Sequence, residues 1–98
     1  MQLVVNWGTG TNTVTLTEGQ KVTIQVPGCR FLAYEVFSFD ESGNRFIAHI
    51  GQTQLGTDSD TFVLAYQGKS LKGRAMLKVN AWDSSWQMYG FEKDFQII

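Results

Sequence analysis

The chain has 98 residues, of which 8 are Lys or Arg and 9 are Asp or Glu, so its formal net charge at pH 7 is −1. This length suits one domain, and the balanced charge argues against nucleic acid as the main partner and against docking on an anionic membrane. Apolar residues make up 43% of the chain and the single cysteine has no partner within it, which excludes both disorder and an internal disulfide scaffold.

The residue types favour β-structure. Val, Ile, Thr, Phe, Tyr and Trp supply more than a third of the chain, whereas Ala and Leu are scarce. Branched and aromatic side chains suit a pleated, half-buried surface, and no stretch of eleven residues repeats its apolar positions with the period of a helix. The sequence therefore predicts an all-β protein.

The first half of the chain contains the clearest strand patterns. Leu3 to Trp7 is typical of a short strand, and apolar residues then alternate over Thr13–Thr17 and again over Lys21–Val26. A short loop with one glycine separates these two strands. Phe31–Phe39 follows with apolar residues on both faces, so we expect a central strand that is covered on both sides. Arg45–Ile50 is its expected hairpin partner.

The second half continues the pattern after a long polar loop over residues 51–60. Further strands are expected at residues 61–66, 74–82 and 86–98. We expect a polar hairpin over residues 67–73 and a tight turn at residues 83–85. About eight antiparallel strands, separated by turns, are typical of a β-sandwich or a jelly-roll-like fold, and we expect one such domain over residues 1–98.

Two segments resemble parts of immunoglobulin-like domains. Val14–Val26 resembles their first hairpin region, and Asp58–Leu64 resembles their tyrosine-corner stretch, with Phe62 in the place of the tyrosine and Leu64 in that of the second cysteine. The chain departs from the family because it has no cysteine pair and no Trp within Phe31–Phe39. The resemblance implies a sandwich and carries no activity with it.

Candidate catalytic residues are few. The only histidine, His49, lies in an expected strand, and the only cysteine, Cys29, follows the corner at Pro27 and Gly28. Neither has a residue nearby in sequence that could act with it in nucleophilic catalysis. If Ala48 and Ile50 face the core, His49 faces outward. We therefore expect no enzyme, with Cys29 as a small apolar filler.

Metal sites are equally poor in ligands. One histidine excludes a blue-copper site, and zinc would need more Cys or His than the chain contains. Asp58 and Asp60 in the long polar loop leave calcium open, since two carboxylates and backbone carbonyls are its usual ligands. We expect no cofactor and no metal.

One stretch of the chain is locally basic. No acidic residue occurs between Thr61 and Trp82, where the basic residues are Lys69, Lys72, Arg74 and Lys78. Such a patch is suited to docking on an unlike surface, and these residues are predicted to bind a partner. Alternatively, the lysines protect an edge strand from pairing with other molecules.

Trp82 and Trp86 flank the turn predicted at residues 83–85. In a tight hairpin their rings would lie almost opposite each other and either clamp the hairpin or form an exposed apolar plate. Such a plate would suit a sugar or a protein neighbour, and Trp7 and Tyr89 could enlarge it. Both tryptophans are therefore predicted partner-binding residues.

These observations favour a non-catalytic structural or binding protein. In size, near-neutral charge and lack of cysteine pairs, the chain resembles the small accessory (cement or decoration) proteins of bacteriophage capsids, which implies a virion protein that staples capsid subunits. The alternatives are a carbohydrate-binding module that uses exposed Trp residues and an inhibitor of one protein.

The N-terminus has no basic region or long apolar run, so we expect synthesis in the cytoplasm and no membrane partner. Self-oligomers are a further expected partner.

Overall fold

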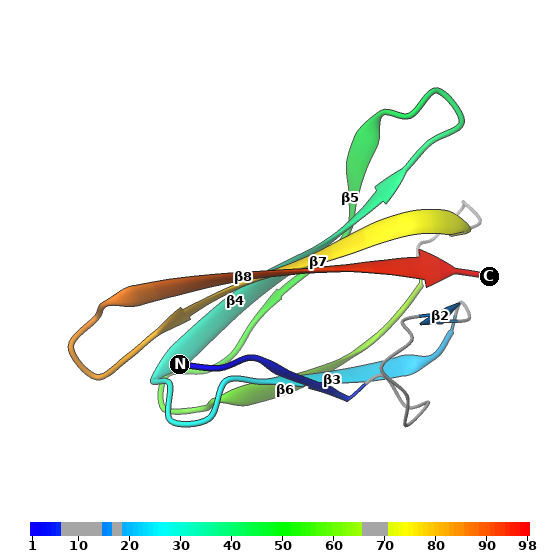
Figure 1. The fold of residues 1–98 in the computed structure, drawn as a ribbon. Coiled ribbons are helices and arrows are strands. Elements are labelled where there is room, and N and C mark those ends of the chain that lie inside the picture. The colour runs from blue at the N-terminus through cyan, green and yellow to red at the C-terminus, as the bar shows by residue number, and fades with distance from the viewer. Residues whose placement is uncertain (7–14, 17–18, 66–70) are drawn as a thin grey trace.

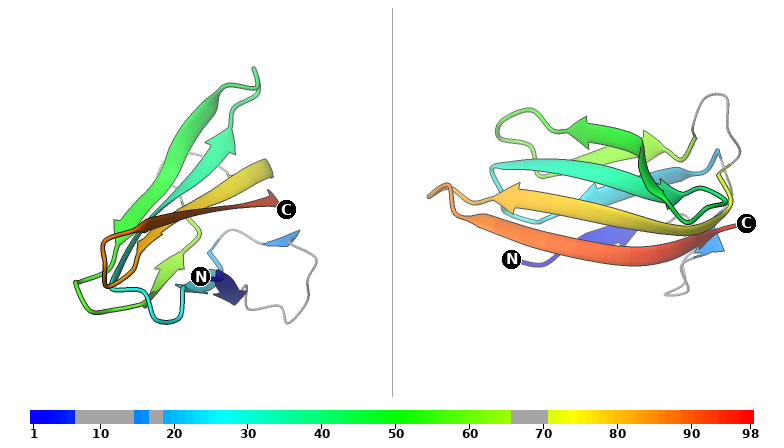
Figure 2. Two further views of the ribbon diagram at one scale, coloured as in Figure 1. Left: turned by 60° about the vertical axis from the view of Figure 1, so that its left-hand side comes forward. Right: turned by 90° about the horizontal axis from the view of Figure 1, so that it is seen from above.

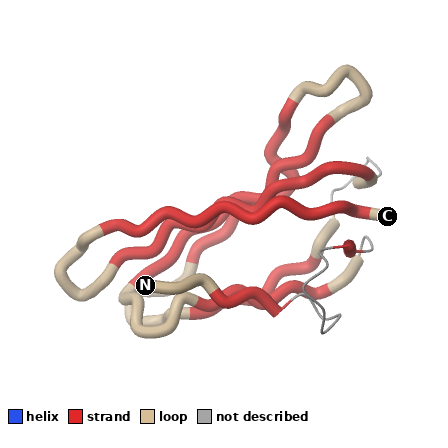
Figure 3. Tube along the Cα trace, in the orientation of Figure 1, coloured by secondary structure: helices blue, strands red, loops and turns tan. Residues whose placement is uncertain are grey.

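The computed structural model of the chain describes residues 1–6, 15–16, 19–65 and 71–98. These residues form two sheets that face each other, with no helix in the described part (Figures 1 and 3). One sheet has the strand order β1-β3-β6 and the other β2-β8-β7-β4-β5. The strands are β1 (Val4–Asn6), β2 (Thr15–Leu16), β3 (Lys21–Gln25), β4 (Phe31–Phe39), β5 (Arg45–Gln52), β6 (Ser59–Val63), β7 (Gly73–Trp82) and β8 (Met88–Ile97). The predicted β-sandwich is confirmed.

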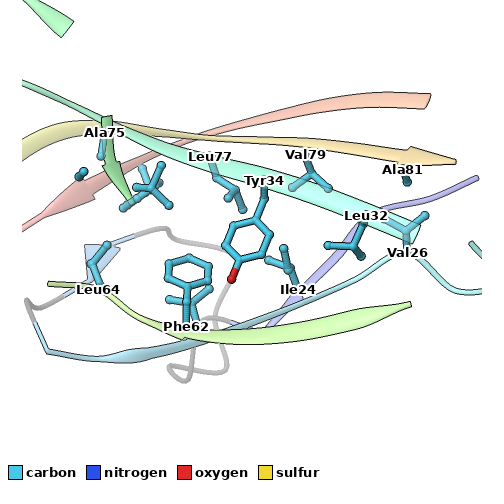
Figure 4. Packing of buried hydrophobic residues seen from close by; sticks show 14 of the residues in the cluster. Ile24, Val26, Leu32, Tyr34, Phe62, Leu64, Ala75, Leu77, Val79 and Ala81 are labelled. Carbon is cyan, nitrogen blue, oxygen red and sulfur yellow. The ribbon is translucent and has the colours of Figure 1, made fainter. Parts of the chain in front are cut away.

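Alternating side chains build the core between the two sheets. Leu32, Tyr34 and Val36 of β4 point inward and are at most 3% exposed, and they meet the inward residues of β3 and β6 (Figure 4). From β7 the inward residues are Ala75, Leu77, Val79 and Ala81. The predicted position of β4 inside its sheet is correct, since β7 and β5 flank it. Its outer face, however, has no second layer among the described residues.

A bulge in the β4–β5 pair reverses the expected orientation of His49. Val36 pairs with His49 but the next residue, Phe37, pairs with Ile47, so Ala48 is the extra residue. One additional residue shifts the alternation of a strand to the other face. His49 therefore faces the inside of the sandwich, and the prediction that it faces outward is wrong. Ile50 points outward instead, with 67% of its surface exposed.

Two predicted strand pairings are also wrong. β2 and β3 were expected on either side of a short loop in one hairpin region, but β2 pairs in parallel with β8, while β3 pairs with β1 and β6. Thus one pair is parallel among strands expected to be antiparallel. β6 and β7 belong to different sheets, so residues 67–73 do not join two paired strands. An apolar alternation identifies the buried face of a strand and not its neighbour.

The C-terminal strand completes the larger sheet. β8 pairs with β7 along its whole length, and the two run side by side in Figure 2. Phe95 and Ile97 are 3% and 2% exposed, which confirms the prediction that this strand buries one face. None of the described segments is a helix long and apolar enough to cross a membrane.

Candidate functional site

The outer face of the five-stranded sheet contains a groove across β5, β4 and β7. Its volume is about 340 Å³, and it is lined by residues 33–35 and 50–52 together with Lys78 and Asn80. Residues that pair across antiparallel strands point to the same face, and the neighbours of Ala33 and Glu35 in β4 are buried in the core. Ala33, Glu35 and their cross-strand partners therefore point out of the sandwich.

One row across the groove places two amides beside small residues. Ala33 pairs with Gln52 on one side and with Asn80 on the other, and Asn80 pairs with Gly90 of β8. A Cβ built on Gly90 would lie 3.5 Å from Oδ1 of Asn80, so that amide lies over the glycine. The floor of the groove is thus low, with a carboxamide on each side of Ala33.

The next row carries the charges of the groove. Lys78 pairs with Glu35 of β4 and with Glu92 of β8, and Glu35 pairs with Ile50 of β5. Of the two glutamates, Glu35 lines the groove and Glu92 does not. Glu35 and Lys78 cancel in charge, and the exposed Ile50 supplies an apolar wall. The groove therefore offers a carboxylate, an ammonium and two amides with no net charge.

An aromatic ledge borders the row of amides. Phe31 pairs with Trp82, and the centres of their rings lie 5.3 Å apart at an angle of 40°. Trp82 pairs on its other side with Met88, which is 56% exposed. This ledge lies one row beyond Ala33, two residues away along β4.

The predicted pairing of Trp82 with Trp86 is wrong. The β7–β8 loop covers residues 83–87 and is closed by Asp83, whose Oδ1 accepts hydrogen bonds from the backbone nitrogens of Ser85 and Gln87. Trp86 lies at the loop tip with φ 61°, and the guanidinium carbon of Arg30 lies 4.9 Å from its ring centre. The longer loop separates the two tryptophans, so they form no common plate.

At the other end of the outer face, two arginines lie over phenyl rings. The guanidinium carbon of Arg45 is 4.3 Å from the centre of the Phe37 ring, and that of Arg74 is 4.7 Å from the centre of the Phe39 ring. Phe37 is only 7% exposed although it points outward. Each arginine therefore covers an apolar ring, and stacking on that ring fixes the position of its planar guanidinium group.

The predicted basic residues are only partly brought together. Arg74 and Lys78 share the outer face of β7, where each lies two residues from Met76 along the strand, on opposite sides of it. Lys72 is exposed immediately before β7, and Lys69 lies outside the described residues. Trp7, proposed above to enlarge an aromatic plate, also lies outside them.

A second cluster of polar and aromatic groups joins the two sheets. The hydroxyl of Tyr34 donates a 2.6 Å hydrogen bond to Asp60 Oδ2, and the rings of Tyr34, His49 and Phe62 are stacked with centres 4.9–5.6 Å apart. Burial lowers the pKa of His49, although the nearby Asp60 acts in the opposite direction. Burial and Asp60 together raise the pKa of Tyr34.

This cluster and the nearby carboxylates do not form a metal site. The described residues contain no group of three His, Cys, Asp or Glu side chains that could hold a metal ion. Asp58 accepts hydrogen bonds from the backbone nitrogen of Gly28 and from Gln25, while Asp60 binds Tyr34. The two candidate calcium ligands thus serve separate contacts.

Cys29 lies beside the Asp58 contact and is 6% exposed. Its pKa is raised, mainly by burial and further by the charge of Asp58. A raised pKa favours the protonated thiol over the nucleophilic thiolate. Its position agrees with the expected role as an apolar filler.

Comparison with known proteins places the fold. No protein-family model matches the chain, and no curated protein matches it in sequence. CopC from Methylosinus trichosporium OB3b has a similar structure, with a TM-score of 0.62 and 12% identity over 97% of this chain and 90% of its own. An LPMO from Kitasatospora papulosa gives a TM-score of 0.55 and 15% identity over 91% of this chain. This chain spans 52% of that protein.

The expectation of a virion accessory protein is wrong. Two solved structures of similar fold are a CopC and an LPMO, and neither is a capsid protein. Size, charge and cysteine content supported that expectation, and none of these describes a strand order. The sugar-binding alternative required Trp82 and Trp86 to lie opposite each other. The structure does not have this arrangement, because Trp82 pairs with Met88.

Sequence reasoning missed the main residues of the groove, which are Ala33, Glu35, Gln52 and Asn80. A usable signal was present in β4 and β7, where the residues between core positions include Glu35, Lys78 and Asn80 as well as several aromatic rings. A sheet face that alternates rings with hydrogen-bonding groups is unusual for a plain solvent face. Finding the groove also required the register of three strands, which no local pattern contains.

Proposed function

We propose that the chain is a binding domain that holds a saccharide in the groove across β5, β4 and β7. One observation carries the proposal: Glu35, Lys78 and Asn80 line a groove of about 340 Å³. Sugar hydroxyls donate and accept hydrogen bonds, so they are matched by a mixture of carboxylate, ammonium and amide groups.

The apolar parts of the groove are consistent with the same ligand. Ile50 forms one wall, and the ledge of Phe31 and Trp82 lies beside the row of amides. The C–H faces of sugar rings pack on such surfaces while their hydroxyls reach polar groups. Because Glu35 and Lys78 cancel in charge, the groove itself gives no net attraction to a phosphate or another highly charged small ligand.

The fold comparison supports this proposal only in a general way. One solved structure with a similar fold is an LPMO, a lytic polysaccharide monooxygenase, and this chain covers about half of it. The proposal concerns binding alone, and no catalytic step is assigned to this chain. His49 faces the inside of the sandwich, away from the groove on the outer face.

A titration with soluble oligosaccharides tests the proposal. Backbone amide signals of the ¹⁵N-labelled protein are followed by NMR while cello-, xylo- and galacto-oligosaccharides are added. We expect at least one sugar to shift the signals of residues 33–35, 50–52, 78 and 80 and to leave those of β6 unchanged. Shifts confined to β6 or the loop tips, or no shift with any neutral or uronic oligosaccharide at millimolar concentration, would overturn the proposal.

A matched pair of variants gives an independent check. Glu35→Gln and Glu92→Gln each remove one carboxylate next to Lys78, but only Glu35 lines the groove. We expect Glu35→Gln to weaken binding about five- to tenfold, because a charged acceptor makes a stronger hydrogen bond than an amide. Glu92→Gln should change the affinity less than twofold. Equal effects of both variants would show that the affinity depends on the charge near Lys78 and not on a direct contact between Glu35 and the sugar.

A further inference from the structure

We propose, on the basis of the saccharide groove, that the ligand is a carboxylated saccharide and that Arg45 and Arg74 bind its carboxylates. Both arginines lie on the outer face of the same sheet, on either side of Phe39: Arg45 pairs with it across β4 and β5, and Arg74 stacks on its ring. The site therefore continues from the groove toward the end of the face that carries Phe37 and Phe39.

The two guanidinium groups are ready to bind an anion. Each has its carbon within 4.7 Å of a phenyl ring centre, and among the described residues neither has a carboxylate partner. Stacking on a ring leaves the in-plane N–H groups of an arginine free, and these match the two oxygens of a carboxylate. Holding the planar group in place also reduces the entropy that is lost on binding.

The spacing calls for an oligomeric ligand. Along β4, Glu35 lies two residues from Phe37, which Arg45 covers, and four residues from Phe39, which Arg74 covers. These spacings are about 7 Å and about 14 Å along a strand. Met76 and the exposed Ile47 lie between them on the same face and give the ligand an apolar surface to cross, whereas Phe37 is covered by Arg45. A chain of several sugars can therefore occupy the groove with one residue and reach the arginines with another.

The distribution of charge favours isolated carboxylates over denser anions. Glu35, Glu92 and Asp94 project from the same face and would repel a ligand that carries several charges on each sugar. A uronic acid carries one charge on each residue. An acidic peptide is less suited, because its backbone would bind at the open edge of β5 and the groove lies on the face of three strands.

The test compares oligogalacturonate with its methyl ester, which has the same sugar chain without the charges. Affinities are measured by isothermal titration calorimetry for the wild type and for Arg45→Gln/Arg74→Gln. We expect the wild type to bind the acid about tenfold or more tightly than the ester, as charged hydrogen bonds allow. The double variant should bind both ligands with similar affinity, close to that of the wild type for the ester.

Lys21→Gln/Lys93→Gln is the matched control, since it removes two exposed positive charges off the outer face: Lys21 belongs to the other sheet, and Lys93 pairs with the inward-facing Leu77. We expect it to keep the preference for the acid, and thermal unfolding should show that both double variants fold. Equal loss in the control, or tight binding of polyglutamate or dextran sulfate at the same arginines, would overturn the inference. If the wild type binds acid and ester equally, the carboxylate inference fails and the saccharide proposal stands. If it binds neither acid nor ester nor any neutral sugar, both fail.

Discussion

The hydroxyl of Tyr34 on β4 donates a 2.6 Å hydrogen bond to the Asp60 carboxylate on β6, and so connects the two sheets of the sandwich. The ring of Tyr34 is buried in the core, and only its hydroxyl needs a polar partner. Without Asp60, that hydroxyl would be desolvated and unpaired. The Tyr34 ring stacks on His49, and the charge of Asp60 acts on the pKa of His49, so the contact links the groove strand β4 with the titratable cluster.

We expect Tyr34→Phe to lower the free energy of unfolding by about 1.5–3 kcal/mol, the usual contribution of a hydrogen bond to a charged group. Urea denaturation at pH 7 gives the measurement. Tyr89→Phe is the control, because its hydroxyl lies 3.4 Å from Asp83 Oδ2 at a loop, and it should cost less than about 0.5 kcal/mol. Equal losses in the two variants would show that the bond between the sheets has no special value.

We expect a side chain at position 51 to destabilise the protein, because the Tyr34 ring occupies the space that a side chain at Gly51 would need. A Cβ at Gly51 would lie 2.5 Å from Cζ and Oη of the Tyr34 ring, whereas a Cβ at Gly90 would meet nothing closer than 3.5 Å. Gly51→Ala should therefore destabilise the protein by about 1–3 kcal/mol and Gly90→Ala by much less. In a Tyr34→Ala background the cost of Gly51→Ala should disappear. A cost that persists there would place the strain in the backbone.

Acidification should destabilise the protein through His49. Burial lowers its pKa below the ordinary value of 6.5, so the unfolded chain binds the proton more tightly than the folded one. The stabilising contribution is complete above about pH 6.5 and is lost as the pH falls toward the folded pKa.

His49→Phe keeps an aromatic ring between Tyr34 and Phe62 and removes the titration. We expect its unfolding free energy to depend less on pH between 7.5 and 5 than that of the wild type. Parallel pH curves would assign the effect to carboxylates.

The fold was predictable from the sequence wherever a strand kept its alternation. β7 places apolar residues at every second position, and its buried face was predicted correctly from Leu77 and Val79. β4 was predicted to be covered on both sides, but only the face of Leu32 and Val36 packs into the core. The partners of β2 were not predictable, because the same alternation is compatible with either sheet. The β4–β5 bulge was hidden as well, since one extra residue, Ala48, carries no sequence signal of its own.

The candidate site was less predictable than the fold. Arg74 and Lys78 were singled out for their charge, but their use depends on Phe39 and Glu35, which come from a strand far away in sequence. The tryptophans attracted attention through their residue type. Their geometry depends on a five-residue loop closed by Asp83, and a loop of three residues would have placed them opposite each other.

The backbone of Trp86 should carry strain that a glycine relieves. Its φ of 61° lies in the left-handed region, which costs a residue with a side chain roughly 1 kcal/mol. We expect Trp86→Gly to be more stable than Trp86→Ala by about that amount, since both variants lose the contact with Arg30 and differ only at Cβ. Thermal unfolding of the two variants decides this. Equal stabilities would show that the loop relaxes around an alanine.

Removal of residues 91–98 should unfold the chain and not merely shorten it. This segment contains the buried Phe95 and Ile97, and each such side chain contributes roughly 1.5–3 kcal/mol through its buried area. β7 would also lose the hydrogen-bonded partner of residues 73–79. Together these losses are comparable with the whole stability of a small domain, about 5–15 kcal/mol.

Deletion of Ile98 alone is the control, because that residue is 66% exposed and lies beyond β8. Far-ultraviolet circular dichroism and thermal unfolding should show a folded control and an unfolded truncated chain. A truncated chain that still unfolds cooperatively would show that the core closes without residues 91–98. If that chain also lost its partner or its oligomeric state, the segment would be an arm for docking on another molecule.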